Sequence, residues 1–446
     1  MDFDHSIFKA YDIRGIVPGQ LNAEIANAIG NSLAGYLKPK TIAVGRDMRV
    51  SGAELSEALI SGINDRGVDV VDLGMISTDA LYFAVGKYGY DGGVMITASH
   101  NPPEYNGFKV CRKAAVPLSG SEGLDVICDD LVNDRMEKSS SRGSIARRDI
   151  LEDFADHVLT FVDPHGIKPF TLAIDAGNGM AGITLDPVFK KLPCRVIPLF
   201  YEPDGRFPNH PANPIVKENL IDLQKAIKEN KADLGAAFDG DADRMFLLKK
   251  DGTPLGGDMV TALVANKLLT ENPNQTIIYN LICSRAVPEL IARKGGKAIR
   301  SRVGHAIIKP LMKKHNAIFG GEHSGHFYFR DNWYADSGLI ALLVCLELLS
   351  KADRDLGDIL AEIDPYVRSG EINSRVRDID DKIDEVAAAF GDGENDRLDG
   401  LTVQYPDWWF NLRPSNTEPL LRLNVEANNQ DLLDEKVKKL TEIIRS

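Results

Sequence analysis

The chain has 446 residues, with 52 Lys and Arg against 65 Asp and Glu, and a formal net charge of −13. This acidic balance argues against a general nucleic-acid or anionic-membrane surface, because both require a basic face. It leaves a small anionic ligand open, since a cleft can be locally basic on an acidic protein. At about 150 residues per domain, the length predicts about three domains, or four if one is small.

The first residues and the cysteines indicate the cellular compartment. The chain opens without the basic and apolar regions of a secretory signal. The longest apolar run, 339–349, contains Glu347 and is too short for a bilayer, which takes ~20 residues, so we expect a buried helix. The five cysteines are odd in number and include no C-x-x-C, which argues against a disulfide framework or a zinc site. We therefore expect a soluble, cytoplasmic protein.

Strands and helices are predicted to alternate through the first three quarters of the chain. The first unit is predicted to have strands at 41–44, 68–71 and 93–97 and a helix at 53–63. The polar stretch 133–149 reads as a linker rather than a solvated helix end. The second unit has strands at 170–174 and 234–238 and a helix at 219–231, and the third has helices at 258–269 and 336–350 and a strand at 276–281. This alternation predicts α/β units with parallel or mixed sheets.

The pattern changes after Pro365. Helices are expected at 379–390 and 431–445, and strands at 401–404, 408–412 and 420–427. This order predicts a small α+β tail domain after three α/β units.

Three carboxylates, Asp239, Asp241 and Asp243, follow the predicted strand 234–238 at every second position. An extended run or a converging loop would each present all three to one cation, and such hard oxygens suit Mg²⁺. An EF-hand is excluded, because the sixth position is Arg244 rather than Gly and the twelfth is Lys250 rather than Glu. The alternative is an acidic turn, whose like charges would still require a cation among them.

A hydroxyl, Ser99, follows the predicted strand 93–97, at the carboxyl end where open α/β sheets bind ligands. The hydrolase pattern G-x-S-x-G is absent around it. His100 is expected to be a poor base for Ser99, because adjacent extended residues point to opposite sides. The run 105–109 could return the Lys109 ammonium toward Ser99, which would suit a phosphorylated serine. A turn of Ser, Asn and Pro is the alternative.

Two later loops carry polar groups suited to a sugar phosphate. Glu322, Ser324 and His326 lie on a Gly-rich loop and could recognise hydroxyls, with a plain Gly turn as the alternative. Arg413 precedes Ser, Asn and Thr, which suits a phosphate monoester, with a hydrophilic hairpin loop as the alternative. The run 175–182 has the glycines of a dinucleotide fingerprint but no clear ribose-binding acid downstream, so a tight strand-to-helix turn is predicted.

Together these loops resemble those of the α-D-phosphohexomutase superfamily, of the phosphomannomutase/phosphoglucomutase type. The resemblance starts at FKAYDIRG (8–15), continues through TASHNP, DGDADR and GEHSGH to RPSNTEP, and covers essentially the whole chain. It implies three similar α/β domains with mixed sheets plus a small C-terminal α+β domain, arranged around a central cleft. The corresponding boundaries are 1–147, 148–250, 251–365 and 366–446.

The resemblance also implies a role for each matching residue. Ser99 would be the phosphoserine, and the expected metal site consists of Ser99, Asp239, Asp241 and Asp243 holding Mg²⁺. The implied catalytic residues are Ser99, His100, Lys109, Arg14, Arg244 and His326. The implied substrate-binding residues are Tyr11, His305, Glu322, Ser324, Arg413, Ser415, Asn416 and Thr417.

The implied activity is the interconversion of a hexose 6-phosphate and a hexose 1-phosphate through a phosphoserine enzyme and a hexose 1,6-bisphosphate, which also acts as activator. Mannose phosphates are the leading substrates, because Asn416 is typical of the phosphomannomutase type; phosphoglucomutase and phosphoglucosamine mutase are the alternatives. Ile282 stands where relatives with dual specificity are expected to carry Lys, and Arg285 could compensate. Lys109, His326 and Arg14 remain equal candidates for proton transfer.

Two other classes compete with a mutase: a non-catalytic sugar-phosphate-binding protein and a metal-dependent phosphatase. The intact Ser99 and the three aspartates argue against the non-catalytic class. The expected partners are small-molecule sugar phosphates, with no nucleic acid and no membrane, and the expected state is a monomer or weak dimer. The polar stretch 368–380 is predicted to be the hinge of the tail domain.

Overall fold

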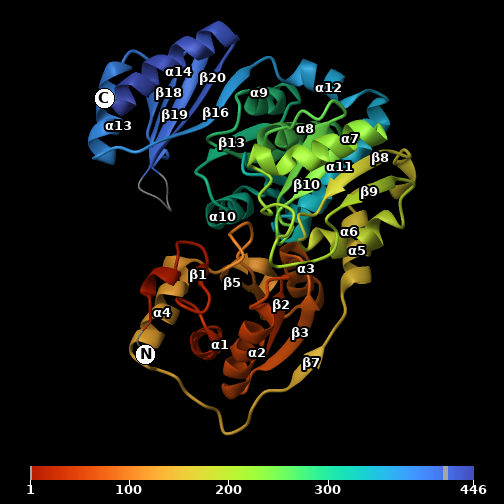
Figure 1. Cartoon of the computed structure of the whole chain (residues 1–446), viewed down its shortest axis with the longest axis vertical. Coiled ribbons are helices and arrows are strands. Elements are labelled where there is room, and N and C mark those ends of the chain that lie inside the picture. The colour runs from red at the N-terminus through yellow and green to blue at the C-terminus, as the bar shows by residue number, and fades with distance from the viewer. Residues whose placement is uncertain (1–2, 415–419) are drawn as a thin grey trace.

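The computed structural model of the protein describes residues 3–414 and 420–446. In this part of the chain four sheets follow one another, each with its own helices (Figure 1). The first three combine parallel and antiparallel strand pairs, whereas the pairs of the fourth are antiparallel. The predicted fold class, three α/β domains with mixed sheets and a small C-terminal α+β domain, is confirmed.

The first sheet has the strand order β1-β5-β4-β2-β3-β7, with β6 paired to β5. Its strands are β1 (Ile13–Ile16), β2 (Thr41–Arg46), β3 (Asp69–Met75), β4 (Gly92–Ile96), β5 (Tyr105–Arg112), β6 (Val116–Pro117) and β7 (Ile145–Arg147). Its helices are α1 (Ala23–Leu37), α2 (Gly52–Asp65), α3 (Thr78–Tyr88) and α4 (Leu124–Val132). The predicted linker 133–149 contains one edge strand, β7, which pairs with β3.

The second sheet has the order β11-β10-β8-β9. Its strands and helices are β8 (Thr171–Asp175), β9 (Arg195–Leu199), β10 (Leu234–Phe238), β11 (Met245–Lys249), α5 (Leu151–Leu159), α6 (Ala181–Phe189) and α7 (Ile221–Asn230). Because β8 ends at Asp175 and α6 starts at Ala181, the run 175–182 is the predicted strand-to-helix turn.

The third sheet repeats this plan in the order β13-β12-β14-β15. Its elements are β12 (Thr276–Asn280), β13 (Lys297–Ser301), β14 (Phe319–Gly321), β15 (Phe327–Phe329), α8 (Gly257–Glu271), α9 (Ala286–Arg293), α10 (His305–His315), α11 (Gly338–Ala352) and α12 (Leu356–Ile363). Short 3₁₀ segments in the first three domains are η1 (His5–Ile7), η2 (Lys113–Ala115), η3 (Gly120–Glu122), η4 (Pro164–Gly166), η5 (Lys217–Leu220) and η6 (Arg330–Asn332).

The fourth sheet corrects one expectation. Its elements are β16 (Val367–Ser374), β17 (Glu394–Asp396), β18 (Leu401–Gln404), β19 (Trp408–Pro414), β20 (Leu421–Ala427), α13 (Ile379–Ala389) and α14 (Gln430–Arg445), in the sheet order β16-β20-β19-β18-β17. The predicted hinge 368–380 is wrong, because most of it is β16 or α13, and β16 is hydrogen-bonded to β20. The connection into this domain is the short segment 364–366 between α12 and β16.

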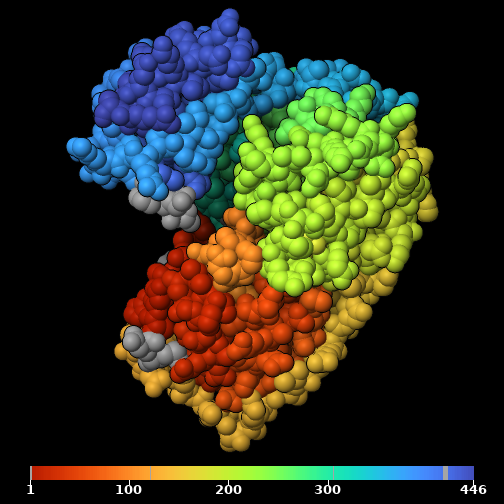
Figure 2. All heavy atoms as spheres, in the orientation of Figure 1, coloured from red at the N-terminus to blue at the C-terminus, as the bar shows by residue number. Residues whose placement is uncertain are grey.

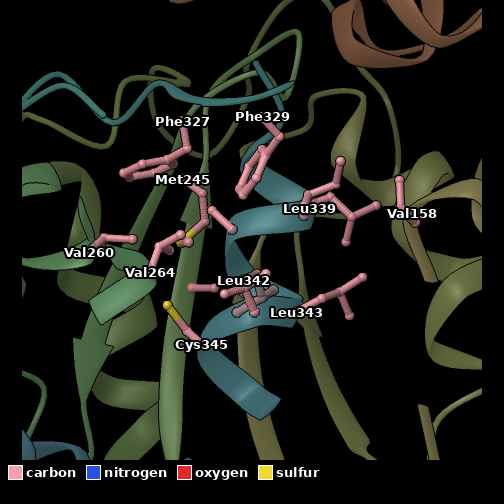
Figure 3. Close-up of a cluster of buried hydrophobic side chains, with 14 of the residues drawn as sticks. Val158, Met245, Val260, Val264, Phe327, Phe329, Leu339, Leu342, Leu343 and Cys345 are labelled. Atoms are coloured by element: carbon pink, nitrogen blue, oxygen red, sulfur yellow. The ribbon is translucent and has the colours of Figure 1, made fainter. Parts of the chain in front are cut away.

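One continuous apolar core extends through the first three domains, each of which also has a cluster of its own, whereas the fourth domain has only a separate core among the described residues. Figure 3 shows Leu339, Leu342 and Leu343 of α11 against Phe329 of β15 and Val158 of α5. The apolar run 339–349 is thus a buried helix, as predicted. No helix of the described residues is long and apolar enough to cross a membrane. The five cysteines are free, as expected.

The molecular surface is hollowed between the N-terminal domain (red) and the C-terminal domain (blue), as Figure 2 shows. This hollow corresponds to the cleft that the resemblance implies. The loops that follow the carboxyl ends of β4 and β10 meet near it, and they carry the first groups of the candidate site.

Candidate functional site

The loop after β4 presents Ser99 to the second domain. Ser99 is fully buried and has φ 51°, so the chain turns sharply at this residue. Its backbone N–H donates to Thr97 Oγ1 at 2.9 Å, which stabilises the turn. The Ser99 hydroxyl consequently reaches across the domain junction and donates to Asp239 Oδ2 at 2.7 Å.

His100 does not face away from Ser99, as extended geometry would require. Its Nδ1 lies 3.2 Å from Ser99 Oγ, because the left-handed backbone at Ser99 ends the alternation of side chains. Arg244 Nη2 donates to the same Nδ1 at 2.8 Å. The nearby Arg244 charge and burial hold the pKa of His100 well below its usual range, so the imidazole stays neutral at pH 7 and remains a poor base.

The three aspartates converge because the connection between β10 and β11 is a loop rather than an extended run. Ala242 has φ 61° within it. One carboxylate oxygen from each of Asp239, Asp241 and Asp243 lies within 4.8 Å of the others, and all three residues are buried. Of the two arrangements open from the sequence, the structure has the converging loop.

The charges of this loop are only partly balanced by protein groups. Lys109 Nζ donates to Asp241 Oδ2 at 2.7 Å and to Asp243 Oδ2 at 2.5 Å. Burial lowers the pKa of Lys109, but these carboxylates outweigh burial and hold it well above its usual range. Burial, with repulsion from Asp241 and Asp243, raises the pKa of Asp239 to about 7. Lys109, which lies on β5, therefore pairs with two carboxylates of the cluster whose third member, Asp239, accepts from Ser99.

This cluster fits a divalent metal ion. The buried Asp241 Oδ1 accepts no hydrogen bond from the described residues, and the buried Asp243 Oδ1 lies 3.5 Å from His326 Nε2, outside hydrogen-bond geometry. A buried anionic oxygen that accepts no hydrogen bond is costly, and an oxygen-liganded cation would satisfy it. The residues that could hold the ion are Asp239, Asp241 and Asp243, with the Ser99 side chain beside Asp239.

Arg14 and Tyr11 extend the site along the first domain. Arg14 Nη1 donates to Asn101 Oδ1 at 2.5 Å, and Arg14 also pairs with Asp12. Tyr11 lies against the third domain, since a Cβ built on Gly304 would be 3.2 Å from the Tyr11 ring. Burial raises the pKa of Tyr11, so its hydroxyl stays protonated near neutral pH.

The loop between β14 and β15 brings the third domain to the same place. Glu322 is buried; its Oε1 accepts from Tyr328 and its Oε2 accepts from the Gly304 N–H at 3.1 Å. His326 Nδ1 lies 3.1 Å from Ser324 Oγ, and His326 Nε2 lies 3.5 Å from Asp243 Oδ1. Burial lowers the pKa of His326, but Asp243 has the larger combined effect and raises it.

The fourth domain carries a cationic pair. Arg413 on β19 lies opposite Arg422 on β20, and both guanidinium groups share Glu371, at 3.3 Å and 3.6 Å. Two cations with one carboxylate leave an excess of positive charge, and the buried Arg413 Nε has no hydrogen-bond partner among the described residues. This charge and this donor suit a phosphate. Ser415, Asn416 and Thr417, and the side chain of His305, lie outside the described residues.

Sequence reasoning missed three residues of this region. Arg422 could have been found from the hairpin register, which places it opposite Arg413. Thr78, whose hydroxyl donates to Asp241 Oδ2 at 2.6 Å, had no sequence signal. Arg49 follows β2, at the carboxyl end of a central strand, and contacts the Ser99 loop. The Arg285 guanidinium, which could compensate for the Lys expected at Ile282, donates to the Tyr405 and Pro406 carbonyls of the fourth domain.

Comparison with known proteins identifies the family. Four family descriptions match in order: "Phosphoglucomutase/phosphomannomutase, alpha/beta/alpha domain I" over residues 5–135, domain II over 152–252, domain III over 256–366, and the C-terminal domain over 371–443. A "Phosphomannomutase" of Salmonella montevideo is 40% identical over 455 aligned positions, covering 98% of this chain and 99% of its own. A "Phosphomannomutase" of Escherichia coli K12 is 41% identical, covering 94% of both chains.

A crystal structure of a phosphoglucomutase/phosphomannomutase family protein from Burkholderia thailandensis superposes with a TM-score of 0.90 at 34% identity. The superposition covers 99% of this chain and 98% of that one. Matches to all four domains and identities of about 40% over nearly the full length leave no part of the fold unexplained. The chain therefore belongs to the phosphoglucomutase/phosphomannomutase family of enzymes, within the α-D-phosphohexomutase superfamily that its four loops resemble.

Proposed function

We propose that the enzyme interconverts a hexose 6-phosphate and a hexose 1-phosphate, with mannose 6-phosphate and mannose 1-phosphate as its main substrates. The observation that carries the proposal is the contact of Ser99 Oγ with Asp239, 2.7 Å across the junction of two domains, beside two further buried carboxylates. The relatives named "Phosphomannomutase" at about 40% identity support mannose as the sugar.

In the proposed cycle Ser99 carries a phosphoryl group. The phosphorus–oxygen bond to Ser99 Oγ breaks while a bond forms to the free hydroxyl of the bound hexose phosphate, whose proton is released. The resulting hexose 1,6-bisphosphate turns over in the cleft and returns its other phosphoryl group to Ser99. Free bisphosphate would likewise phosphorylate Ser99 and so act as activator.

The residues around Ser99 neutralise and orient the transferring group. Asp239, Asp241, Asp243 and the phosphorylated Ser99 would hold Mg²⁺, which supplies charge neutralisation to the phosphoryl oxygens when bound. Lys109 and Arg244 add positive charge, and Arg14 fixes Asn101 of the serine loop. His100 keeps Nδ1 beside Ser99 Oγ.

The third and fourth domains are proposed to bind the substrate. Glu322 and Ser324 would accept and donate to sugar hydroxyls, with Tyr11 and His305 beside them. Arg413, with Ser415, Asn416 and Thr417, would hold the phosphate that is not reacting, so that its binding energy positions the hydroxyl at Ser99. We keep the domain boundaries 1–147, 148–250, 251–365 and 366–446 as part of this proposal.

His326 is the best-placed group for proton transfer among Lys109, His326 and Arg14. Lys109 is committed to two carboxylates and Arg14 to Asp12 and Asn101. The His326 ring bridges Ser324 of the sugar loop and Asp243 of the aspartate loop, so it connects the proposed sugar site with the proposed metal site.

The test is a coupled assay with mannose, glucose and glucosamine phosphates, each supplied with Mg²⁺ and a trace of hexose 1,6-bisphosphate. We expect isomerisation without net release of inorganic phosphate, fastest with the mannose pair. Faster turnover of glucose or glucosamine phosphates would assign one of the alternative mutases. Phosphate release would indicate a phosphatase, and binding without turnover would indicate a non-catalytic protein.

A further inference from the structure

We propose that Arg49 is a positioning residue for phosphoryl transfer, which clamps the backbone of the Ser99 loop and ties that loop to the second domain. The inference rests on the proposed function only for its kinetic consequence. The clamp itself consists of hydrogen bonds from Arg49 to backbone carbonyl groups, and none of them involves the Ser99 hydroxyl.

The Arg49 guanidinium donates to four backbone carbonyls of one loop. Its Nη2 donates to the carbonyls of Ser99 at 2.9 Å and Asn101 at 2.6 Å, and its Nη1 to those of Pro102 at 2.7 Å and Tyr105 at 2.8 Å. These acceptors span the connection between β4 and β5. A planar fork can serve four carbonyls arranged in this way, whereas an ammonium group has three donors on one atom.

The orientation of the Arg49 guanidinium is determined by Asp47. The Arg49 side chain is fully buried, and its Nε lies 3.3 Å from Asp47 Oδ2, whose side chain is also fully buried. The Arg49 backbone N–H donates to Asp47 Oδ1 at 2.9 Å. Asp47 therefore balances the buried charge and sets the direction of the guanidinium, as a carboxylate does in a buried pair.

The same residue meets the second domain. The Arg49 guanidinium lies 5.3 Å from the centre of the Phe207 ring. A Cβ built on Gly205 would be 2.5 Å from Arg49 Cα, so the backbones of the two domains are in close contact here. On the other side, a Cβ built on Gly240 would be 2.5 Å from the Ser99 carbonyl oxygen. This carbonyl is thus enclosed between Arg49 and the loop that carries the aspartates.

The clamp explains how a strained residue keeps its geometry. A non-glycine residue at φ 51° persists only when its surroundings determine its conformation. Arg49 holds the carbonyl side of the loop inward, which leaves the Ser99 hydroxyl directed at Asp239. Since a displacement of about 1 Å at a reacting group can cost about 10²-fold in rate, loss of the fork should lower kcat.

The test compares Arg49→Lys and Phe207→Leu with Arg66→Lys as the matched control. Arg66 belongs to the same domain and its Nε donates to Asn31 Oδ1 at 2.9 Å, but it contacts no residue of the Ser99 loop. We expect Arg49→Lys to lower kcat by about 10²-fold with KM changed less than about threefold, and Phe207→Leu to lower kcat by about fivefold. Arg66→Lys should stay within twofold of the unmodified enzyme.

A second measurement separates the clamp from the proposed activity. Hydrogen exchange of the amides in 97–105 should become at least about tenfold faster in Arg49→Lys and stay unchanged in Arg66→Lys. Unchanged exchange in this loop, or a kcat within threefold of the unmodified enzyme, would overturn the clamp. A fall in kcat that merely matches a loss of folded protein would also overturn it. If the unmodified enzyme showed no mutase activity, the exchange result would still decide the clamp.

Discussion

The junction of the first and second domains differs from the junction of the third and fourth. At the first, Ser99 donates to Asp239 and Lys109 pairs with Asp241, and the first three domains share one apolar core. At the second, the fourth domain has a core of its own and is joined through the short segment 364–366.

The fourth domain is held to the third by polar contacts. Arg368 Nε lies 2.9 Å from Glu426 of its own domain and 3.4 Å from Asp258 of the third. Arg285 donates its N–H to Glu426 Oε1 at 3.0 Å. Polar interfaces between separately cored domains are the ones at which relative motion is expected. The groups proposed for phosphoryl transfer are therefore built into a rigid body, whereas those proposed to hold the distal phosphate lie on a domain that can reorient.

The largest effect is expected from a substitution at the first junction that removes the Ser99 hydroxyl. Ser99→Ala removes the hydroxyl that would carry the phosphoryl group, so mutase activity should fall by at least about 10³-fold. Intact-mass analysis should show one phosphate on the enzyme that keeps Ser99 and none on the variant. Incubation with excess unphosphorylated sugar should remove this phosphate. Full activity of Ser99→Ala would contradict the covalent scheme.

The next effect concerns the charge of the aspartate loop. Asp241→Asn removes one of three carboxylates, so kcat should fall by about 10²-fold and the Mg²⁺ concentration for half-maximal rate should rise. A titration of rate against Mg²⁺ checks both, with Asp251→Asn, an exposed residue beyond the loop, as control. Turnover that persists in excess chelator would refute the metal assignment.

A smaller effect is expected at the second junction, and it should be of another kind. Arg413→Ala removes a cation from the proposed distal phosphate site, so KM should rise by about 10- to 100-fold while Ser99 remains phosphorylated. The variant should also release more hexose 1,6-bisphosphate into solution, which quenched-flow product analysis would detect. Normal substrate binding with no leaked intermediate would assign this domain another role.

The smallest effects are expected from two glycine substitutions, which compare the first junction with the fourth domain. At Gly240 a methyl group would meet the Ser99 carbonyl, so Gly240→Ala should lower kcat by about tenfold. At Gly370, φ is 69° and no atom lies within 4 Å of a built Cβ, so Gly370→Ala should cost only about 1 kcal/mol of stability. Thermal unfolding and kcat, measured on both variants, test the difference. Equal kcat values would show that the first junction is less rigid than its contacts indicate.

Local pattern was enough to predict much of the fold. The helix 53–63, the strand 401–404 and the buried helix in 339–349 lie where the hydrophobic spacing places them, because burial of one face determines each element. The hinge prediction for 368–380 is wrong because β16, a strand rich in polar residues with one buried residue, has the composition of a loop. Its pairing with β20 depends on residues about 50 positions away.

The sequence by itself also determined which chemical groups the site contains, since Ser99 and the three aspartates each stand directly after a strand that the local pattern identifies. Only the tertiary structure decided how they face one another. The left-handed turn at Ser99 placed His100 beside the hydroxyl, and the pairing of β5 with β4 carried Lys109 to the aspartates. Arg49 acquires its neighbours in the same way, through contacts with the backbone of a loop 50 positions away, which local propensity does not encode.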